Sequence, residues 1–134
     1  MRILIAEDDF ASRKFMLKFL SKYADVDATV DGDEAVAAFE FALEDHQPYD
    51  LVCLDIMMPN MNGIEALRQI RLVEERYGID RSARCKIIMT TALNEVNKVD
   101  QAFEKGCEGY AVKPIDTDKF LIIMKKMGFD LNEA

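Results

Sequence analysis

The chain has 134 residues, of which 50% are hydrophobic, and its formal net charge is −8 at pH 7. This length suits one compact domain with a real core and is short for two, and the sequence shows no basic leader segment and no apolar run near the roughly 20 residues that cross a bilayer. The acidic balance argues against nucleic-acid binding, which depends on clustered Lys and Arg, so the chain is predicted to be a soluble cytoplasmic protein with protein partners.

Five segments of strand length alternate with five segments in which apolar residues recur at helical spacing. In chain order, the expected strands and helices are 2–6 and 8–23, 26–30 and 31–46, 49–55 and 63–78, 85–92 and 93–106, and 107–114 and 116–128. Acids before the first helix and Asp31 before the second are typical of helix N-caps.

The expected strands read as continuous apolar runs, for example "RILIA" and "LVCL". Such runs are typical of strands covered on both faces, as in a parallel sheet wrapped by helices. Right-handed crossovers then favour a doubly wound α/β fold. In these folds the ligand site lies beyond the carboxyl ends of the strands, where the strand order reverses.

Acidic, hydroxyl and amine side chains follow four of the five expected strands. They are Glu7, Asp8, Asp55, Thr90, Thr91 and Lys113. Carboxylates gathered in one pocket repel each other, and a bound cation relieves the repulsion. Because no Cys or His lies at a metal-ligand spacing, an oxygen-only site that leaves room for water favours Mg²⁺.

Asp55 stands alone at the end of the central strand and is the candidate nucleophile toward a phosphoryl group. Lys113 would then pair with the added phosphoryl charge, and a threonine hydroxyl could donate to it. Each residue alone also fits a structural role, since acids before helices often serve only as caps. Their convergence on one edge of the sheet favours the chemical interpretation.

One small basic group, Arg81, Arg84 and Lys86, is expected to decorate a solvated connection. In the last helix, five consecutive apolar residues, "FLIIM", are too many for one helical stripe. Leu121 or Ile122 therefore faces either a deeper core contact or a partner.

Four motifs, "ILIAEDD", "LVCLDIMMPNMNG", "IIMTTA" and "GYAVKP", resemble in order and spacing the response-regulator receiver domain of two-component signalling. The resemblance runs from Arg2 to about Met127 and is most similar to the stand-alone chemotaxis type. It implies a flavodoxin-like fold with strand order 2-1-3-4-5 and five helices. It also implies a receiver domain over 1–128, a short C-terminal tail over 129–134 and no output domain.

The resemblance implies that Asp55 is the phosphoacceptor. Asp8, Asp55 and the backbone carbonyl of Met57 would bind Mg²⁺, and Glu7 would act largely through a metal-bound water. Lys113 would pair with the phosphoryl group, and the peptide bond before Pro114 is typically cis in this family.

Thr91 matches the family's switch hydroxyl better than Thr90, because the small residue that follows the switch position in the family is Ala92 here. Tyr110 matches the aromatic residue that turns inward as the threonine moves, although a strand tyrosine packed on the sheet is also expected at such a position. Gly63 is expected to allow a backbone conformation that other residues resist.

As for function, the resemblance implies a phosphorylation switch that catalyses only its own phosphorylation and dephosphorylation. Its partners would be a histidine kinase or phosphotransfer domain and a downstream protein bound by the fourth helix, fifth strand and fifth helix, with the chain a monomer or weak homodimer. One alternative is a Mg²⁺-dependent phosphohydrolase, but that enzyme would want an acid where Met57 stands. Another is a receiver-shaped binding module that works without phosphorylation.

Two positions depart from the polar residues that many receiver domains carry, namely Met57 and Leu93. Both flank the path of a water that would attack the aspartyl phosphate, and neither side chain can orient it by a hydrogen bond. The sequence therefore predicts a comparatively long-lived phosphoryl group.

Overall fold

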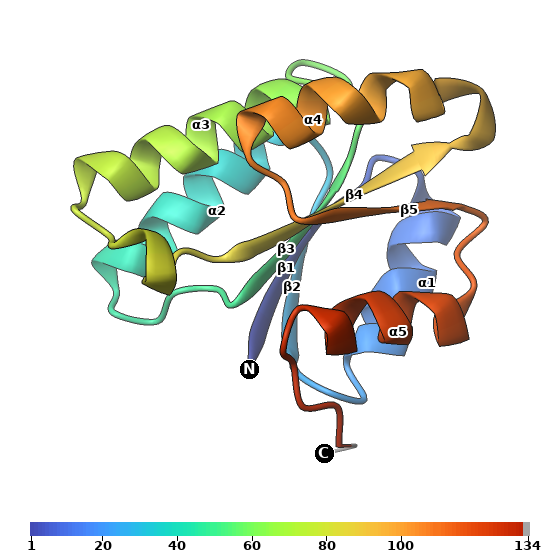
Figure 1. Cartoon of the computed structure of the whole chain (residues 1–134), viewed down its shortest axis with the longest axis horizontal. Coiled ribbons are helices and arrows are strands. Elements are labelled where there is room, and N and C mark those ends of the chain that lie inside the picture. Colours follow the sequence, from blue (N-terminus) through green and yellow to red (C-terminus); the bar gives the residue numbers. More distant parts are fainter. Residues whose placement is uncertain (133–134) are drawn as a thin grey trace.

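The computed structural model describes residues 1–132 and places five parallel strands in one sheet, in the order β2-β1-β3-β4-β5 (Figure 1). The strands are β1 (Arg2–Ala6), β2 (Asp25–Thr29), β3 (Leu51–Asp55), β4 (Lys86–Ala92) and β5 (Gly109–Lys113). The helices are α1 (Phe10–Leu20), α2 (Gly32–Glu44), α3 (Gly63–Arg76), α4 (Val99–Lys105) and α5 (Thr117–Lys126), with 3-10 segments η1 (Arg81–Ala83) and η2 (Leu93–Lys98). The predicted fold and strand order are confirmed.

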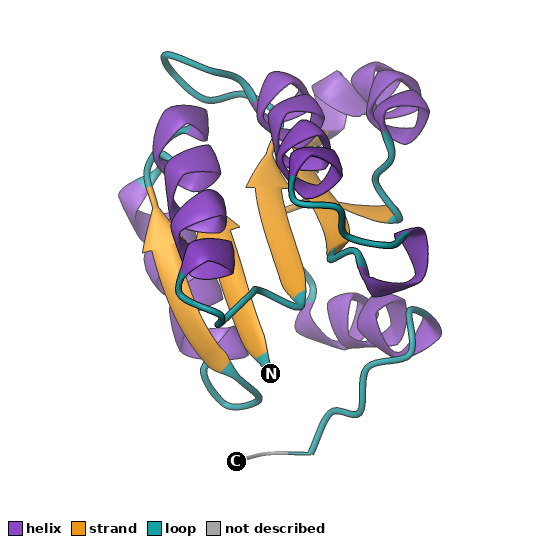
Figure 2. Ribbon diagram, turned by 90° about the vertical axis from the view of Figure 1, so that its left-hand side faces the viewer, coloured by secondary structure: helices purple, strands orange, loops and turns teal. Residues whose placement is uncertain are grey.

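Helices cover both faces of the sheet, with α1 and α5 on one face and α2, α3 and α4 on the other (Figures 1 and 2). Successive residues of a strand point to opposite faces, so Leu4 packs in the core under α2 and α3, and Ile3 packs in the core with Phe19 and Phe120. Ile3 and Leu4 are both fully buried. Two covered faces explain why the central strands are uninterrupted apolar runs.

The edge strand β2 differs from the expected pattern, since Thr29 is its only buried residue. It pairs with one neighbour, β1, and its outer side faces solvent. This position tolerates the two acids Asp25 and Asp27, which a strand covered on both faces would exclude.

The fourth helix is shorter than predicted, because residues Leu93–Lys98 form the 3-10 segment η2 and only Val99–Lys105 are α-helical. Side chains of Asp9, Asp31, Asn62 and Asp116 cap the other four helices. No side-chain hydrogen bond caps the start of η2 or α4. This segment therefore lacks the side-chain hydrogen bond that stabilises the first turn of the other four helices.

Gly63 is needed because a side chain would not fit there, and not for the unusual backbone conformation expected from the sequence. Its backbone φ is not positive, so conformational freedom is not what the position requires. A Cβ atom placed there would lie 2.1 Å from the carbonyl oxygen of Asp55, and the Gly63 N–H donates to the carbonyl of Ile56 at 2.8 Å. The missing side chain therefore lets the start of α3 approach the end of β3.

The residues after α5 fold back onto the core. The Phe129 N–H donates to the carbonyl of Met124 at 3.2 Å, and Phe129 and Leu131 pack beside the cluster under α1 and α5. The predicted tail over 129–134 is thus partly packed up to residue 132, and its last two residues lie outside the described part of the chain. Within residues 1–132, no helix is both long and apolar enough to cross a membrane.

Candidate functional site

Three acids meet at the carboxyl edge of the sheet, and we call Glu7, Asp8 and Asp55 the acidic site. One carboxylate oxygen from each lies within 4.8 Å of the others. Glu7 and Asp55 are 3% and 5% exposed, whereas Asp8 is open to solvent. Three oxygen ligands with one open side fit a hard divalent cation that keeps several waters, as Mg²⁺ does.

The turn between β1 and α1 holds Glu7 and Asp8 in place. The Asp9 side chain caps α1 by accepting from the Ser12 N–H at 2.9 Å, and the Glu7 carboxylate accepts from the Asp9 N–H at 3.1 Å. The guanidinium of Arg13 donates to the carbonyl of Glu7 at 2.9 Å. Sequence reasoning missed Arg13, because nothing in its local sequence distinguishes a backbone-bonding arginine from a solvated one.

Lys113 joins the acidic site from the end of β5. Its Nζ donates to the Asp55 carboxylate at 2.8 Å and forms an ion pair with Glu7. Burial alone would lower the pKa of Lys113, but its bonds to Asp55 and Glu7 outweigh burial, and its pKa is raised. The lysine is therefore charged at neutral pH and offsets the repulsion between two buried acids. The Lys113–Pro114 peptide bond is cis, as expected from the resemblance.

Burial raises the pKa of Glu7, and the nearby Asp55 carboxylate raises it further, while the bond from Lys113 acts in the opposite direction. Glu7 therefore holds its proton at a higher pH than a solvated glutamate does. A cation bound at the acidic site would compete with that proton.

The loop after β3 passes over the acidic site and is tied to the loop before α2. The Met57 N–H donates to Asp55 at 3.3 Å, which places the Met57 backbone beside the acceptor carboxylate. Asn60, which has a positive φ of 67°, donates from its side-chain amide to the Asp31 carboxylate at 2.8 Å. Asp31 thus caps α2 and also anchors this loop, a second role that its sequence context did not indicate.

Among the described residues, the hydrogen bonds to the Asp55 side chain come from Met57 and Lys113, and neither Thr91 nor Tyr110 bonds to it. Thr91 is buried, and its hydroxyl donates to the carbonyl of Ala92 at 3.2 Å. Tyr110 is 39% exposed, and its ring packs edge-on against Phe103 of α4 with the centroids 6.4 Å apart. Thr90 points to the opposite face of the sheet from Thr91, where it lines a cavity beside α1 together with Glu7 and Lys113. Of the predicted site residues, the structure brings together Glu7, Asp8, Asp55, Lys113 and the backbone of Met57.

Comparison with known protein families gives one match over nearly the whole chain. The family model described as the response regulator receiver domain matches residues 3–125. The chain belongs to the response regulator receiver domain family. The phosphorylation-dependent signalling class expected from the motifs is thereby confirmed.

Two relatives illustrate the receiver-domain similarity. The chain is 35% identical over 128 residues to the transcriptional regulatory protein ResD of Bacillus subtilis, a match that covers 94% of the chain and 47% of ResD. It is 32% identical over 125 residues to the chemotaxis protein CheY of Bacillus subtilis, covering 93% of the chain and 95% of CheY. The chain thus spans about half of the first relative and nearly all of the second.

The receiver-domain fold also matches solved structures. A chain of the CheX-CheY-BeF3-Mg²⁺ complex from Borrelia burgdorferi superposes with a TM-score of 0.77 at 28% sequence identity. The match covers 97% of this chain and 90% of that one. That structure contains both a divalent cation and beryllofluoride, as its name states.

Proposed function

We propose that Asp55 accepts a phosphoryl group in a Mg²⁺-dependent reaction and that this modification switches the chain between two signalling states. The proposal is carried by one observation: the buried Asp55 carboxylate is held 2.8 Å from Lys113 and beside two further acids. Residues 1–128 are proposed to act as one receiver unit, located in the cytoplasm. A phosphohydrolase is disfavoured because Met57 stands where a second acid would be needed.

In the proposed reaction, a carboxylate oxygen of Asp55 attacks the phosphorus of a phosphodonor, and the bond from phosphorus to the leaving group breaks. Lys113 would move its bond from the Asp55 carboxylate to the new phosphoryl oxygens. Mg²⁺, held by Glu7, Asp8, Asp55 and the Met57 carbonyl, would supply the positive charge that allows an anion to attack an anion.

The phosphoryl group can shift the conformation only through contacts that differ between the two states. In the described structure the Thr91 hydroxyl donates to the carbonyl of Ala92 and Tyr110 faces outward, so both side chains are free to change partners. We propose that Thr91 turns toward the phosphoryl group and that Tyr110 moves inward with it.

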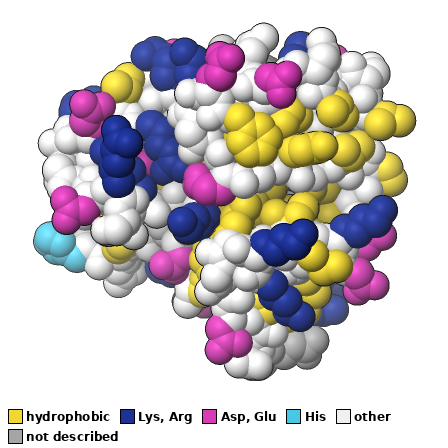
Figure 3. Space-filling model, viewed as in Figure 1, with side chains coloured by type: hydrophobic (Ala, Val, Ile, Leu, Met, Phe, Trp, Pro, Cys, Tyr) yellow, Lys and Arg dark blue, Asp and Glu magenta, His cyan; other side chains and the backbone are white. Residues whose placement is uncertain are grey.

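The surface that would carry the output is formed by α4, β5 and α5. Hydrophobic side chains gather there on the right-hand side of Figure 3, and Phe103, Tyr110 and Ile122 are exposed on it. Of the two residues considered from the sequence, Ile122 faces solvent and Leu121 packs against the core. We propose that a downstream protein binds this surface and that a histidine kinase or phosphotransfer domain supplies the phosphoryl group.

The proposed function is tested by incubating the protein with acetyl phosphate, with and without Mg²⁺, and measuring its intact mass. A mass increase of one phosphoryl group that requires Mg²⁺ is expected. Failure to form the adduct with acetyl phosphate, or to bind beryllofluoride in its place, would contradict the proposal.

Mg²⁺ affinity is expected to fall as the pH is lowered, and the fall should begin at a higher pH than a solvated glutamate would give. The pKa of Glu7 is raised above its ordinary value, chiefly by burial, so this carboxyl takes up its proton earlier on acidification and loses its capacity to assist metal binding. Calorimetric titration with Mg²⁺ at several pH values measures the effect. Glu7→Gln should flatten the pH profile, while Glu104→Gln on the exposed face of α4 should leave it unchanged.

Replacing Met57 by Asn together with Leu93 by Glu is expected to speed loss of the phosphoryl group at least about tenfold, because polar side chains there can orient the attacking water. Met57 and Leu93 are 49% and 77% exposed, so the double variant should fold normally. The decay is timed by intact mass after the phosphodonor is removed. Leu72→Asn, at another exposed apolar residue, is the control, and an unchanged or slower decay in the double variant contradicts the hypothesis.

A further inference from the structure

An open cavity lined by charged side chains lies at the opposite edge of the sheet, where β4 begins. Its volume is about 370 Å³, and we call it the basic cavity. The charged side chains that line it are Arg71, Arg81, Arg84, Lys86, Lys105 and Glu108. Five cations thus face one carboxylate in a chain whose net charge is −8. The sequence had suggested only a solvated connection for three of these residues.

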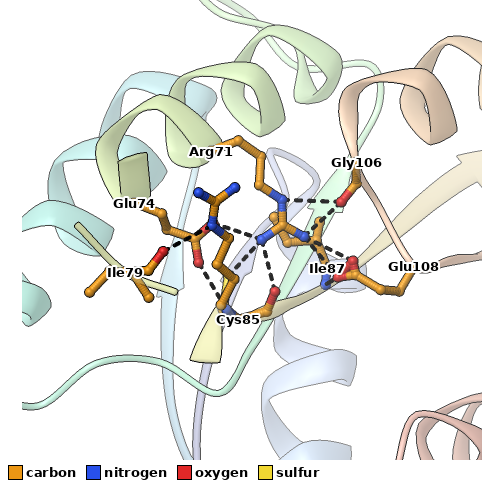
Figure 4. A network of polar contacts seen from close by, with 8 residues as sticks. Arg71, Glu74, Ile79, Cys85, Ile87, Gly106 and Glu108 are labelled. Atoms are coloured by element: carbon orange, nitrogen blue, oxygen red, sulfur yellow. Dashed lines mark hydrogen bonds and ion pairs between the residues drawn. The ribbon is translucent and has the colours of Figure 1, made fainter. Parts of the chain in front are cut away.

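Arg71 and Glu108, which both line the basic cavity, belong to a network of polar contacts that also includes Glu74 (Figure 4). The Arg71 guanidinium contacts the Glu74 carboxylate at 2.7 Å, the Glu108 carboxylate at 2.8 Å and the carbonyl of Gly106 at 2.7 Å. Glu74 is 1% exposed and accepts from the Cys85 N–H at 2.9 Å. Because of these bonds, Arg71 has few donors left for a ligand and the negative charge of Glu108 is already paired. The same bonds hold the backbone at Cys85 and Gly106, which line the cavity.

The other four cations have no such partners. Among residues 1–132, none of Arg81, Arg84, Lys86 and Lys105 forms an ion pair with a carboxylate. Within the described part of the chain, the one side-chain bond from these four is from Arg84 Nε to the carbonyl of Ile79, at 3.3 Å, which leaves the terminal nitrogens of Arg84 available. Like charges that line one cavity repel each other, and an anion bound between them relieves the repulsion.

We propose that the basic cavity binds a compact anion carrying two or more phosphate groups. The forked guanidinium groups of Arg81 and Arg84 match phosphate oxygens, and Lys86 and Lys105 add two point charges. A cavity of about 370 Å³ is in the size range of small-molecule sites. The phosphate chemistry is shared by inorganic pyrophosphate and nucleoside diphosphates.

An acidic peptide fits the basic cavity less well. Peptide partners normally anchor apolar or aromatic side chains in a groove, and the exposed large hydrophobic residues described above do not line this cavity. The site is also separate from the acidic site, because Lys86 starts β4 while Thr90, four residues on, pairs with Asp55. The four residues of extended strand from Lys86 to Thr90 therefore place the basic cavity about 13 Å from the end of the sheet where Asp55 lies.

The test is calorimetric titration of the whole chain with pyrophosphate and with ADP, in a chelator that removes Mg²⁺ and at low ionic strength. Saturable binding is expected, with affinity that falls as salt is added. Arg81→Gln/Arg84→Gln should weaken it at least about tenfold, because each charged hydrogen bond lost has a large effect. Lys86→Gln/Lys105→Gln, which removes no described hydrogen bond, should do the same. The control Lys125→Gln/Lys126→Gln changes the net charge equally on exposed α5 and should bind normally.

The outcomes separate the explanations. Equal affinity for pyrophosphate and ADP assigns the binding to the phosphates alone, and tighter binding of ADP identifies nucleotides as the source. Asp55→Asn should bind as the parent does, which distinguishes this site from the acidic site. The proposal is overturned if no saturable binding is seen, if both double variants and the control lose affinity alike, or if an oligoglutamate peptide of equal charge binds more tightly than either phosphate compound.

Discussion

Replacing Asp55 with Asn is expected to abolish phosphoryl incorporation from acetyl phosphate in the presence of Mg²⁺. The amide has the shape of the carboxylate but lacks the anionic oxygen that would attack phosphorus. Lys113 keeps its ion pair with Glu7, so the surrounding side chains have no reason to rearrange. Intact mass spectrometry should show the phosphoryl adduct on the parent protein and none on the variant.

The matched control is Asp45→Asn, since Asp45 is exposed at the C-terminal end of α2, the opposite end of the helix from Asp31. This variant should take up the phosphoryl group as the parent does. If the adduct persists in Asp55→Asn, or if peptide mapping places it on Asp8, then Asp55 is not the phosphoacceptor.

Replacing Arg71 with Met is expected to lower the free energy of unfolding by about 3–5 kcal/mol, the usual cost of removing one partner from a buried charge network. The Arg71 and Glu74 side chains are only 15% and 2% exposed. Without the guanidinium, Glu74 and Glu108 lose their counter-charge, and the carbonyls of Cys85 and Gly106 lose a donor. Urea denaturation followed by far-UV circular dichroism measures the change.

The control for this effect is Arg76→Met, one turn further along α3. Arg76 is 60% exposed and pairs with Glu40 at 3.2 Å, so its loss should cost no more than about 1 kcal/mol. If the Arg71 and Arg76 variants had equal free energies of unfolding, the prediction that the buried network stabilises the contact of α3 with β4 and β5 would be wrong.

Much of the fold was predictable because the local patterns of the sequence, its apolar runs and helix caps, agree with the positions of the strands and helices in the folded chain. Each apolar run is followed by a helical stripe, and four of the five helices begin with a capping side chain. The exception is the segment after β4, where no cap specifies the first turn and a 3-10 segment replaces it. The acidic site followed from the fold, since parallel strands bring Glu7, Asp55 and Lys113 to one edge.

What the sequence could not reveal depends on distances across the fold. Apart from Glu74, three residues on, the groups that Arg71 bonds to lie 14 to 37 residues away, and no local pattern reveals them. The need for glycine at position 63 arises from the carbonyl of Asp55, a neighbour only in the folded chain. The directions of Thr91 and Tyr110 belong to one conformation of the chain, which residue identity does not determine.

The 3-10 segment η2 has a geometric consequence for this family of switches. Its six residues advance about 12 Å at 3-10 rise but would advance about 9 Å as α-helix. If these residues joined α4 as α-helix, the segment would therefore shorten by about 3 Å. Thr91 lies two residues before this segment, so the proposed movement of its hydroxyl would act directly beside a segment whose length can change.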